Sequence, residues 1–449
     1  MSFPRYPAYK DSGVEWLGEV PEGWAVCALN YRYDVALGKM LDEKRITGNH
    51  LAPYLRNVDV QWGRINIDDL PEMDFSGNDI ARYRLDAGDL LVCEGGEVGR
   101  AAMWRGAMPE CYYQKALHRV RPKNKRTDNP AFLYYILAAA ASRSIFAESG
   151  GKSTIAHLTA EAFRRYRFAF PPKSDQTTIA TFLDRETAKI DALVADYRTL
   201  IELLQEKRQA AISHAVTKGL DPTVPMKDSG VEWLGELPEH WRVVRLAELF
   251  REANDSGEED LPILTVSIHH GVSDKEYEED ELERKVTRSD DRSKYKTVRP
   301  GDLVYNMMRA WQGGFGAVVV NGLVSPAYVV ARPIVPVSTS FIEQVLRCPT
   351  AVEEMRRRSH GVTDFRLRLY WQEFRDIRVG MPPLEEQAET MRLVLDQTAK
   401  FEGLISDAEE AISLLQERRT ALISAAVTGK IDVRGLVAIP ETDLVRSCG

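Results

Sequence analysis

A chain of 449 residues exceeds the roughly 100–200 residues of one ordinary domain, and its 44% hydrophobic content suffices for packed cores. No run approaches about 18 consecutive apolar residues and the first residues lack an apolar leader core, so we expect no membrane span and a cytoplasmic location. Five scattered cysteines without a CxxC pair argue against both disulfides and a metal site.

The net charge of −8 at first argues against a nucleic-acid partner. Residues 1–170, however, carry 23 Lys and Arg against 21 Asp and Glu, and most of the net negative charge lies in residues 226–449. Affinity for DNA depends on cations close to phosphates rather than on the total charge, so local basic faces remain compatible with the composition.

Internal repetition is the strongest signal in the sequence. Residues 10–24 (KDSGVEWLGEVPEGW) and 227–241 (KDSGVEWLGELPEHW) match at 13 of 15 positions. Further pairs follow in the same order: GDLLV at 88–92 with GDLVY at 301–305, FPPKSDQ at 170–176 with MPPLEEQ at 381–387, and LLQEKRQAAISHAVT at 203–217 with LLQERRTALISAAVT at 414–428. The chain is therefore one unit of about 215 residues used twice.

The first part of each repeat is predicted to be a mixed α/β globular domain. Its short β-branched and aromatic runs are bounded by turn residues and indicate strands at 90–95, 118–122, 303–308 and 316–320. Residues 132–149 are apolar and indicate a helix.

The second part of each repeat is predicted to be one long helix. Residues 174–218 contain no Gly or Pro, follow Pro171-Pro172 and stop before Gly219, with Ser174 and Asp175 suited to cap the start. The second helix spans about 385–428, between Pro382-Pro383 and Gly429.

Both helices carry a heptad pattern. We predict one seam at Leu183, Ile190, Tyr197, Leu204 and Ala211, with an alternate seam at Glu186, Leu193, Leu200, Lys207 and His214. The same frame gives Val394, Phe401, Ala408, Leu415 and Leu422, with Gln397, Leu404, Ala411, Arg418 and Ala425. Pairing as an antiparallel coiled coil with pseudo-twofold symmetry buries both stripes; the alternative is that each helix packs only on its own globular domain.

This architecture suits DNA, because two globular domains of unlike sequence on a rod are expected to read two unlike half-sites. The repeated start, the Pro-Pro junctions and the two LLQE helices resemble the specificity subunits of type I restriction-modification enzymes, from about Tyr9 to Val433. The resemblance implies an α+β fold with target recognition domains at 1–170 and 226–380, helical regions at 171–225 and 381–435, and a tail at 436–449.

The resemblance also implies partners. It predicts double-stranded DNA, two methyltransferase (modification) subunits and, through them, motor-nuclease (restriction) subunits. S-adenosylmethionine, ATP and Mg²⁺ are then expected on those partners, with no cofactor and no metal in this chain.

The sequence offers only weak signs of catalysis. Gly150–Thr154 resembles the end of a phosphate-binding loop, but Phe146 stands where its first glycine is required. Asn129-Pro130-Ala131-Phe132 resembles the Asn-Pro-Pro-aromatic motif of amino-methyltransferases but lacks the second proline, and a helix cap explains it better. The histidines, including His269-His270, lack metal-binding spacing. We expect a non-catalytic subunit; a self-sufficient enzyme and a coiled-coil scaffold that never touches DNA are the alternatives.

Candidate DNA-contacting residues are the forked, amide and cationic side chains near the glycine-rich and pre-junction segments. In the first domain they are Arg100, Lys115, His118, Arg119, Lys152, Ser153, Thr154, Arg164 and Arg165. In the second they are Arg309, Gln312, Arg356, Arg357, Arg358, His360, Thr363, Arg366 and Arg368. The alternative for each charge is a solvated or ion-paired surface position.

Segments that are nearly identical in the two repeats suit two identical partners. We predict that they dock the methyltransferase subunits through Trp16, Leu17, Trp233, Leu234, Gln176 and Gln387. The alternative is that they only close the ends of the rod.

Overall fold

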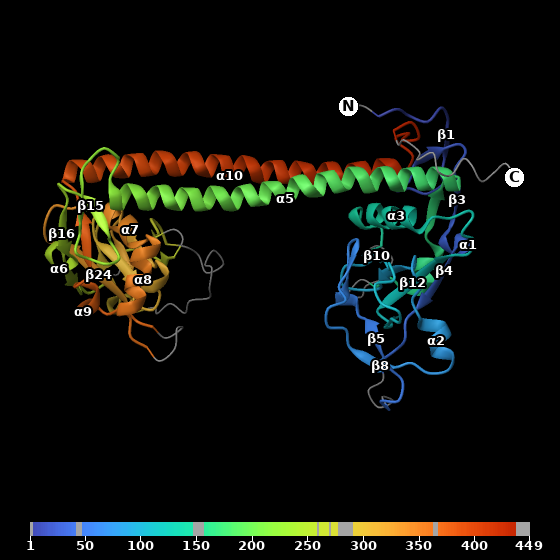
Figure 1. Cartoon of the computed structure of the whole chain (residues 1–449), viewed down its shortest axis with the longest axis horizontal. Coiled ribbons are helices and arrows are strands. Elements are labelled where there is room, and N and C mark those ends of the chain that lie inside the picture. Colours follow the sequence, from blue (N-terminus) through green and yellow to red (C-terminus); the bar gives the residue numbers. More distant parts are fainter. Residues whose placement is uncertain are drawn as a thin grey trace. The chain divides into compact units, whose positions relative to one another are not determined.

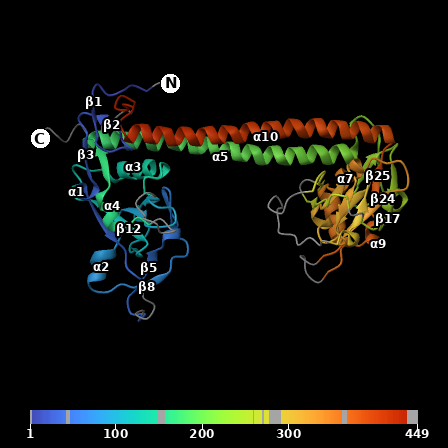
Figure 2. The ribbon, with the colours of Figure 1, turned by 180° about the vertical axis from the view of Figure 1, so that it is seen from behind.

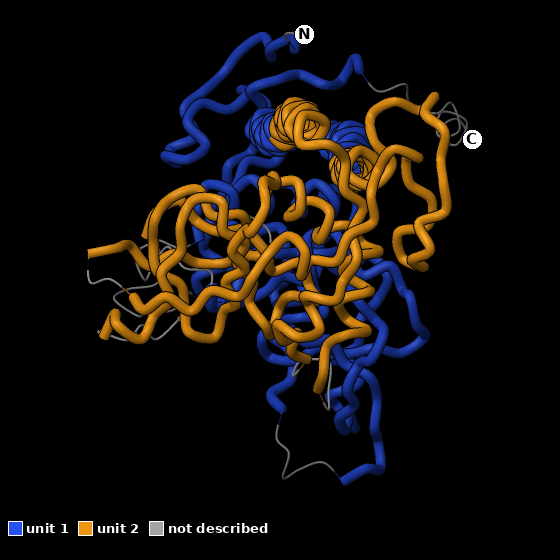
Figure 3. The backbone as a smooth tube through the Cα atoms, turned by 90° about the vertical axis from the view of Figure 1, so that its left-hand side faces the viewer, with its two compact units in different colours: residues 1–197, 410–449 blue, residues 198–409 orange. Residues whose placement is uncertain are grey.

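The computed structural model describes residues 3–41, 47–146, 157–257, 260–268, 271–276, 291–361 and 367–436. The chain divides into two compact units, unit 1 with Met1–Tyr197 and Glu410–Gly449, and unit 2 with Arg198–Glu409 (Figure 3). Helices and strands both contribute to each unit, so the fold is α+β. Each unit includes part of both long helices. The domain limits predicted at 170, 225 and 380 stay a prediction.

Unit 1 is built around a four-stranded antiparallel sheet with the order β10-β9-β12-β4. These strands are β10 (Ala101–Met103), β9 (Leu90–Cys93), β12 (Leu117–Pro122) and β4 (Tyr33–Leu37). A three-stranded sheet contains β11 (Tyr112–Tyr113), β5 (Leu51–Leu55) and β8 (Glu72–Asp74). Every residue of β9 is buried, which explains its continuous apolar run.

Short pairs and helices complete the globular part of unit 1. The strand pairs are β1 (Tyr9–Asp11) with β2 (Glu19–Pro21), β3 (Ala25–Ala28) with β13 (Arg167–Phe170), and β6 (Val60–Gln61) with β7 (Arg64–Ile65). The short helices are α1 (Leu29–Arg32), α2 (Asn78–Tyr83) and α4 (Ala160–Arg165).

Helix α3 (Pro130–Ser142) lies beside the first part of α5 (Lys173–Lys218) in unit 1 (Figure 1). The Asn129 side chain accepts a hydrogen bond from the Ala131 amide and Pro130 opens the helix, as the capping interpretation of this motif predicts. The helix ends earlier than the predicted residue 149, because Ser144 adopts a φ of 56°, outside the right-handed helical region.

Unit 2 contains a matching four-stranded antiparallel sheet with the order β17-β24-β21-β22. Its strands are β17 (Phe250–Ala253), β24 (Tyr328–Pro333), β21 (Leu303–Asn306) and β22 (Phe315–Ala317). The strand pairs are β14 (Met226–Asp228) with β15 (Glu236–Pro238), β16 (Arg242–Arg245) with β25 (Arg378–Met381), β18 (Val266–Ser267) with β19 (Gly271–Val272), and β20 (Lys296–Val298) with β23 (Gly322–Val324). The short helices are α6 (Leu246–Leu249), α7 (Thr339–Leu346), α8 (Pro349–Arg358) and α9 (Trp371–Phe374).

The two long helices, α5 and α10 (Leu384–Val427), match their predicted limits to within one residue. Each has acidic residues in its first turn, where they complement the helix dipole. Each is followed by a glycine in the left-handed region, Gly219 with a φ of 79° and Gly429 with a φ of 72°.

Within unit 1 the first part of α5 and the last part of α10 lie side by side and run in opposite directions (Figures 1 and 2). Arg419 on α10 donates from Nε to Asp191 Oδ1 on α5 at 2.9 Å. Within unit 2 the remaining parts of the same helices are joined by Arg208 and Glu402, whose charged atoms lie 3.5 Å apart. The alternative in which each helix contacts only a globular domain does not describe either unit.

The predicted alternate seam is wrong. Leu193, Leu200 and Leu404 are 47%, 43% and 52% exposed, whereas Val194 and Ala408 are buried. The second row of buried or half-buried residues lies four residues after the first one, at Thr187, Val194, Ile201, Arg208 and Ala215 on α5. The predicted seam was chosen because it contains leucines. The row that faces the neighbouring long helix instead includes Arg208 and Arg419, and each arginine forms an ion pair with a carboxylate on the opposite helix.

Candidate nucleic-acid interface

Three loops of unit 1 meet at one edge of the four-stranded sheet. Residue Leu117 at the start of β12 pairs with Cys93 at the end of β9, and His118 pairs with Leu37 at the end of β4. The segments 38–41, 94–99 and 114–116 therefore leave the sheet at the same edge, and we call them the edge loops of unit 1.

Backbone hydrogen bonds fix these loops against one another. The Glu94 amide donates to the Ala116 carbonyl at 3.0 Å, and the Lys115 amide donates to the Lys39 carbonyl at 2.8 Å. The segment that leads to α4 joins them, because the Leu158 amide donates to the Glu94 carbonyl at 2.7 Å. Gly38 permits the close approach, since a Cβ there would lie 2.3 Å from the Gln114 carbonyl oxygen.

The edge loops of unit 1 and the adjoining segment that leads to α4 carry both signs of charge. Lys115 and His157 are exposed, and Glu94 is half-buried. Burial raises the pKa of the Glu94 carboxyl, and the nearby charges of His157 and Lys115 oppose that shift. The result is a polar surface with a carboxylate between two groups that can carry positive charge.

Unit 2 has the same edge with different side chains. Asn306 at the end of β21 pairs with Tyr328 at the start of β24, and the Leu369 amide donates to the Met307 carbonyl at 2.9 Å. This bond corresponds to the one between Leu158 and Glu94, so Met307 occupies the place of Glu94. The edge loops of unit 2, which are residues 307–314, 325–327 and 367–369, present Met308, Arg309, Trp311, Gln312 and Arg368.

An arginine–aspartate pair supports each sheet behind its edge. Arg121 on β12 binds Asp89, with Nη2 2.7 Å from Oδ2. At the corresponding place in unit 2, Arg332 on β24 binds Asp302 with Nη2 2.8 Å from Oδ2. Because Asp89 and Asp302 are buried, these pairs are part of the framework rather than of the surface.

Three DNA-contact candidates of the first domain are occupied within the protein. His118 is fully buried and its Nε2 lies 2.7 Å from the Leu158 carbonyl oxygen, which requires the ring to donate. Arg119 is buried and donates to the carbonyls of Arg82 and Arg84. Arg100 donates from Nη2 to the Asn57 carbonyl at 3.0 Å. His118 and Arg119 are thus corrected to structural residues, because their side chains point into the sheet's packing.

The other candidates of the first domain differ in exposure and pairing. Lys115 lies exposed on the edge loops. Arg164 donates to the Val35 carbonyl, and Arg165 pairs with Glu161 on the same helix at 2.6 Å. The remaining three, Lys152, Ser153 and Thr154, lie outside the described residues, as does the loop that resembles a phosphate-binding motif.

In the second domain the candidates fall into two groups. Arg309, Gln312 and Arg368 lie on the edge loops, and the backbone of His360 forms a bridge with Arg368. Helix α8 contributes three arginines, each within 4.0 Å of a glutamate: Arg356 with Glu353, Arg357 with Glu232 and Glu353, and Arg358 with Glu354. Thr363, Arg366 and His269-His270 lie outside the described residues.

The predicted docking residues are mostly internal. Leu17 and Leu234 are buried in the cores of their own units, and Trp16 and Trp233 pack against the same cores. These four side chains anchor the repeated KDSGVEWLGE segments to their own units. The docking role of the buried Leu17 and Leu234 is corrected, whereas that of the half-buried Trp16 and Trp233 stays a prediction.

The junction glutamines are also internal. Gln176 is fully buried: its Oε1 accepts from the Asn129 amide at 2.9 Å, and its Nε2 donates to the carbonyls of Thr127 and Pro171 at 3.0 and 2.9 Å. Gln387 makes the equivalent bonds to the Ser338 amide and the Pro382 carbonyl, both at 2.9 Å. Both glutamines tie the start of a long helix to the globular part and are not available to a partner.

Sequence reasoning missed Glu94 and His157. Cationic side chains were expected at a DNA surface, whereas Glu94 is acidic and lies two residues after the repeated GDLLV segment. Its place at the end of a predicted strand next to Gly95-Gly96 was the available signal.

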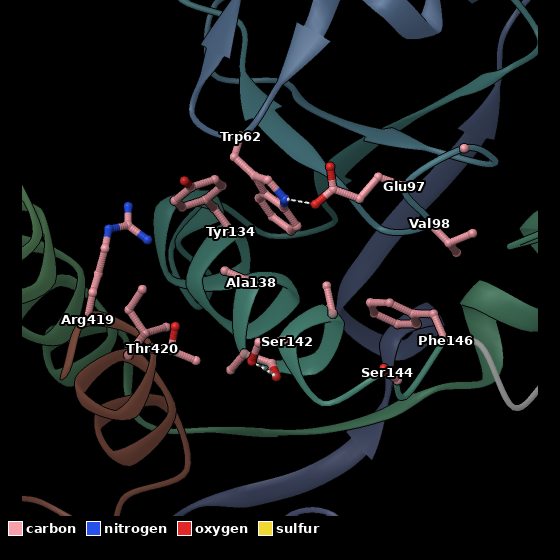
Figure 4. Close-up of a pocket in the computed structure, with 14 residues that line it drawn as sticks. Trp62, Glu97, Val98, Tyr134, Ala138, Ser142, Ser144, Phe146, Arg419 and Thr420 are labelled. Carbon is pink, nitrogen blue, oxygen red and sulfur yellow. Dashed lines mark hydrogen bonds between the residues drawn. The ribbon is translucent and has the colours of Figure 1, made fainter. Parts of the chain in front are cut away.

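A cavity of about 410 Å³ lies in unit 1 between α3, the loop at 96–98 and α10 (Figure 4). Its polar groups are already engaged: Trp62 donates to Glu97, and Arg419 binds Asp191. Across the described residues no cluster of His, Cys, Asp or Glu could hold a metal ion. The described helices likewise include none with the length and apolar character needed to cross a membrane.

The comparisons with known proteins agree on one class. Residues 21–202 match the family model of the type I restriction modification DNA specificity domain. The chain is 27% identical over 239 residues to the type I restriction enzyme MjaVIII specificity subunit of Methanocaldococcus jannaschii, covering 51% of this chain and 50% of that protein. It is 23% identical over 309 residues to the EcoBI specificity subunit of Escherichia coli, covering 64% and 63%. The chain thus matches between half and two thirds of the length of these relatives.

Two solved structures share the fold. One, from a study of complex assembly and conformational transition of the type I R-M system, has a TM-score of 0.61 at 16% identity and covers 91% of this chain and 98% of that one. The HsdS subunit from Thermoanaerobacter tengcongensis has a TM-score of 0.53 at 14% identity with the same coverage.

Proposed function

Because the family model, the relatives and the similar structures all support a specificity subunit of a type I restriction-modification system, we propose that this chain recognises a DNA sequence in two parts and is not itself an enzyme. The globular part of each unit reads one half of the target. The two halves differ in sequence, and the bases between them are not read.

One observation carries this proposal. The two units hold the same sheet edge with the same backbone bond, Leu158 to Glu94 in one and Leu369 to Met307 in the other. The side chains presented on that edge differ, with Glu94 and His157 in unit 1 against Met307 and Arg368 in unit 2. A constant frame with different polar groups suits the reading of two unlike sequences.

The long helices set the separation between the two readers as an antiparallel coiled coil with pseudo-twofold symmetry. The two inter-helix ion pairs support this, because Arg419 and Asp191 correspond to Arg208 and Glu402 at an offset of 211 residues in both helices. Each arginine crosses to a carboxylate on the opposite helix, as a twofold axis requires.

The same helices dock two methyltransferase subunits through leucines that their neighbour helix does not cover. Leu193 and Leu404 are equivalent and exposed, as are Leu203 and Leu414. Repeated apolar side chains in water are typical of an interaction surface, and equal patches suit equal partners. Motor-nuclease subunits join through the methyltransferases, S-adenosylmethionine, ATP and Mg²⁺ belong to these partners, and the assembly works on DNA in the cytoplasm.

Selection of binding sites from random duplex DNA by the purified full-length chain tests the proposal. The expected result is two conserved blocks of different sequence, separated by a fixed number of unselected base pairs. A scaffold that does not bind DNA yields no conserved block, and a single block contradicts a two-part target. Turnover by the chain alone with S-adenosylmethionine or Mg²⁺ would show an enzyme instead.

A further inference from the structure

We propose that Glu94 selects, in the half-target read by unit 1, a base that presents an amino group in the major groove, which is cytosine or adenine. This inference rests on the proposed function, because it assigns a base-reading role to one residue of that same edge.

Glu94 is held in a fixed position at the centre of the edge loops. Its amide donates to Ala116 and its carbonyl accepts from Leu158, so the strand end is tied to two other segments. The next residue, Gly95, is also enclosed: its carbonyl accepts from Asn57 Nδ2 at 3.0 Å, and a Cβ there would lie 3.2 Å from His157 Nδ1. The Glu94 side chain therefore starts from a fixed backbone position, which favours a contact with one defined base over nonspecific contact.

Within the described part of the chain, the Glu94 carboxylate is not tied up by a hydrogen bond to the protein. It forms no ion pair with another described residue, in contrast to Asp89, Asp302 and the glutamates of α8. Lys115 and His157 act on it electrostatically and are themselves exposed. A half-buried carboxylate whose oxygens accept no hydrogen bond from the described residues, and which lies near exposed cations, is suited to accept from a donor on a bound molecule.

The chemistry of a carboxylate restricts that donor. An ionised carboxylate only accepts hydrogen bonds. In the major groove cytosine N4 and adenine N6 donate, whereas guanine O6 and N7 and thymine O4 accept and are repelled. Lys115 and His157 are suited to bind the flanking phosphates. These contacts hold the Glu94 carboxylate close to a duplex whose backbone is negatively charged.

Unit 2 provides an internal contrast. Met307 stands at the equivalent position and its thioether accepts hydrogen bonds only weakly. The preference for an amino-bearing base at this position is therefore confined to the half-target of unit 1.

Site selection with Glu94→Met in the full-length chain tests the inference. Methionine has a similar size, stands at the equivalent position of unit 2 and accepts hydrogen bonds only weakly, so the preference for cytosine or adenine at one position should weaken about tenfold or more, with other positions unchanged. The matched control is Glu22→Met, an exposed glutamate outside the edge loops, which should select the wild-type sequence. An unchanged preference in Glu94→Met, or an equal loss at every position, overturns the inference.

A second measurement needs no variant. Wild-type chain is titrated with its selected duplex and with duplexes in which the selected cytosine or adenine is replaced by an analogue that lacks the amino group. Affinity should fall about tenfold or more only for the analogue at the position read by unit 1. Equal affinity overturns the role of Glu94, whereas a wild-type chain without any sequence preference overturns the proposed function itself.

Discussion

Replacing Gln176 with alanine should destabilise unit 1, because this side chain satisfies three backbone groups inside the protein. Its Oε1 and Nε2 bind the Asn129 amide and the carbonyls of Thr127 and Pro171 at 2.9–3.0 Å, and the residue is fully buried. Alanine cannot replace these bonds, and a buried unsatisfied polar group costs about 1–3 kcal/mol. Part of the loss is recovered where water enters, so we expect about 2–4 kcal/mol in total.

Hydrogen exchange is the appropriate assay, because a chain with two units need not unfold in one step. In Gln176→Ala the Asn129 amide and the first turn of α3 should exchange faster by a factor of roughly 30 or more, while unit 2 is unchanged. The control is Thr178→Ala, two residues further along α5. The Thr178 hydroxyl donates to the Ser174 carbonyl of the same helix and does not join the helix to the globular part. If Gln176→Ala keeps wild-type exchange but loses methyltransferase binding, the glutamine is a docking residue and the structural interpretation is refuted.

Three further outcomes follow from the same contacts. Burial lowers the pKa of His118, so below about pH 6.5 the unfolded chain binds more protons than the folded chain. The free energy of unfolding should therefore fall as the pH is lowered through this range, by up to about 1.4 kcal/mol per pH unit. Thermal melts of His118→Gln at several pH values should lack this contribution. Leu193→Ser with Leu404→Ser should leave thermal stability within about 0.5 kcal/mol and weaken methyltransferase assembly about tenfold or more in a binding titration, and normal assembly refutes the docking surface. Asp302→Ala leaves Asp255 as the remaining carboxylate partner of the Arg332 guanidinium and should cost about 2 kcal/mol by denaturant unfolding. A cost below about 1 kcal/mol shows that Asp255 and solvent compensate.

The long helices were predictable because their signals are local. A Pro-Pro pair, a stretch without Gly or Pro and a terminal glycine each act through nearby backbone, and the limits of α5 and α10 agree to within one residue. The burial of Gln176 was not predictable in this way. Its bonding partners lie 47 and 49 residues earlier in the sequence and depend on where the globular part docks.

The helix seam shows how a local pattern can mislead. Leu193 and Leu200 fit a heptad as well as Val194 and Ile201 do, since both rows repeat every seven residues. Only the partner helix decides which row is covered, and it covers the row that includes Arg208. The presence of leucine in a heptad row therefore does not show whether that row packs against the neighbouring helix or is exposed to solvent.

The DNA-contact residues were predicted less well, because residue type alone does not show which polar side chains are buried. His118 and Arg119 are polar, but they belong to a strand that is buried at both positions. The edge on which Lys115 lies could be anticipated from the strand ends. The proximity of Glu94 to Lys115 and His157 could not be predicted in this way, because it depends on three loops that meet in the folded unit and no local sequence pattern specifies that meeting.

The repeated residues and the variable ones have different tasks. Gln176 and Gln387 are identical in the two repeats and lie inside their units. The arginines bound to the buried Asp89 and Asp302 are also identical in the two repeats and are half-buried. Identity between the repeats therefore reflects the constraints of the common frame, and sequence that matches across them is a poor guide to what the protein recognises. The residues at the sheet edge, such as Glu94, can differ because the frame that holds them is made of backbone hydrogen bonds and not of their own side chains. Under the proposed function, one half of the target can therefore change through a few edge residues while the packing of both units is retained.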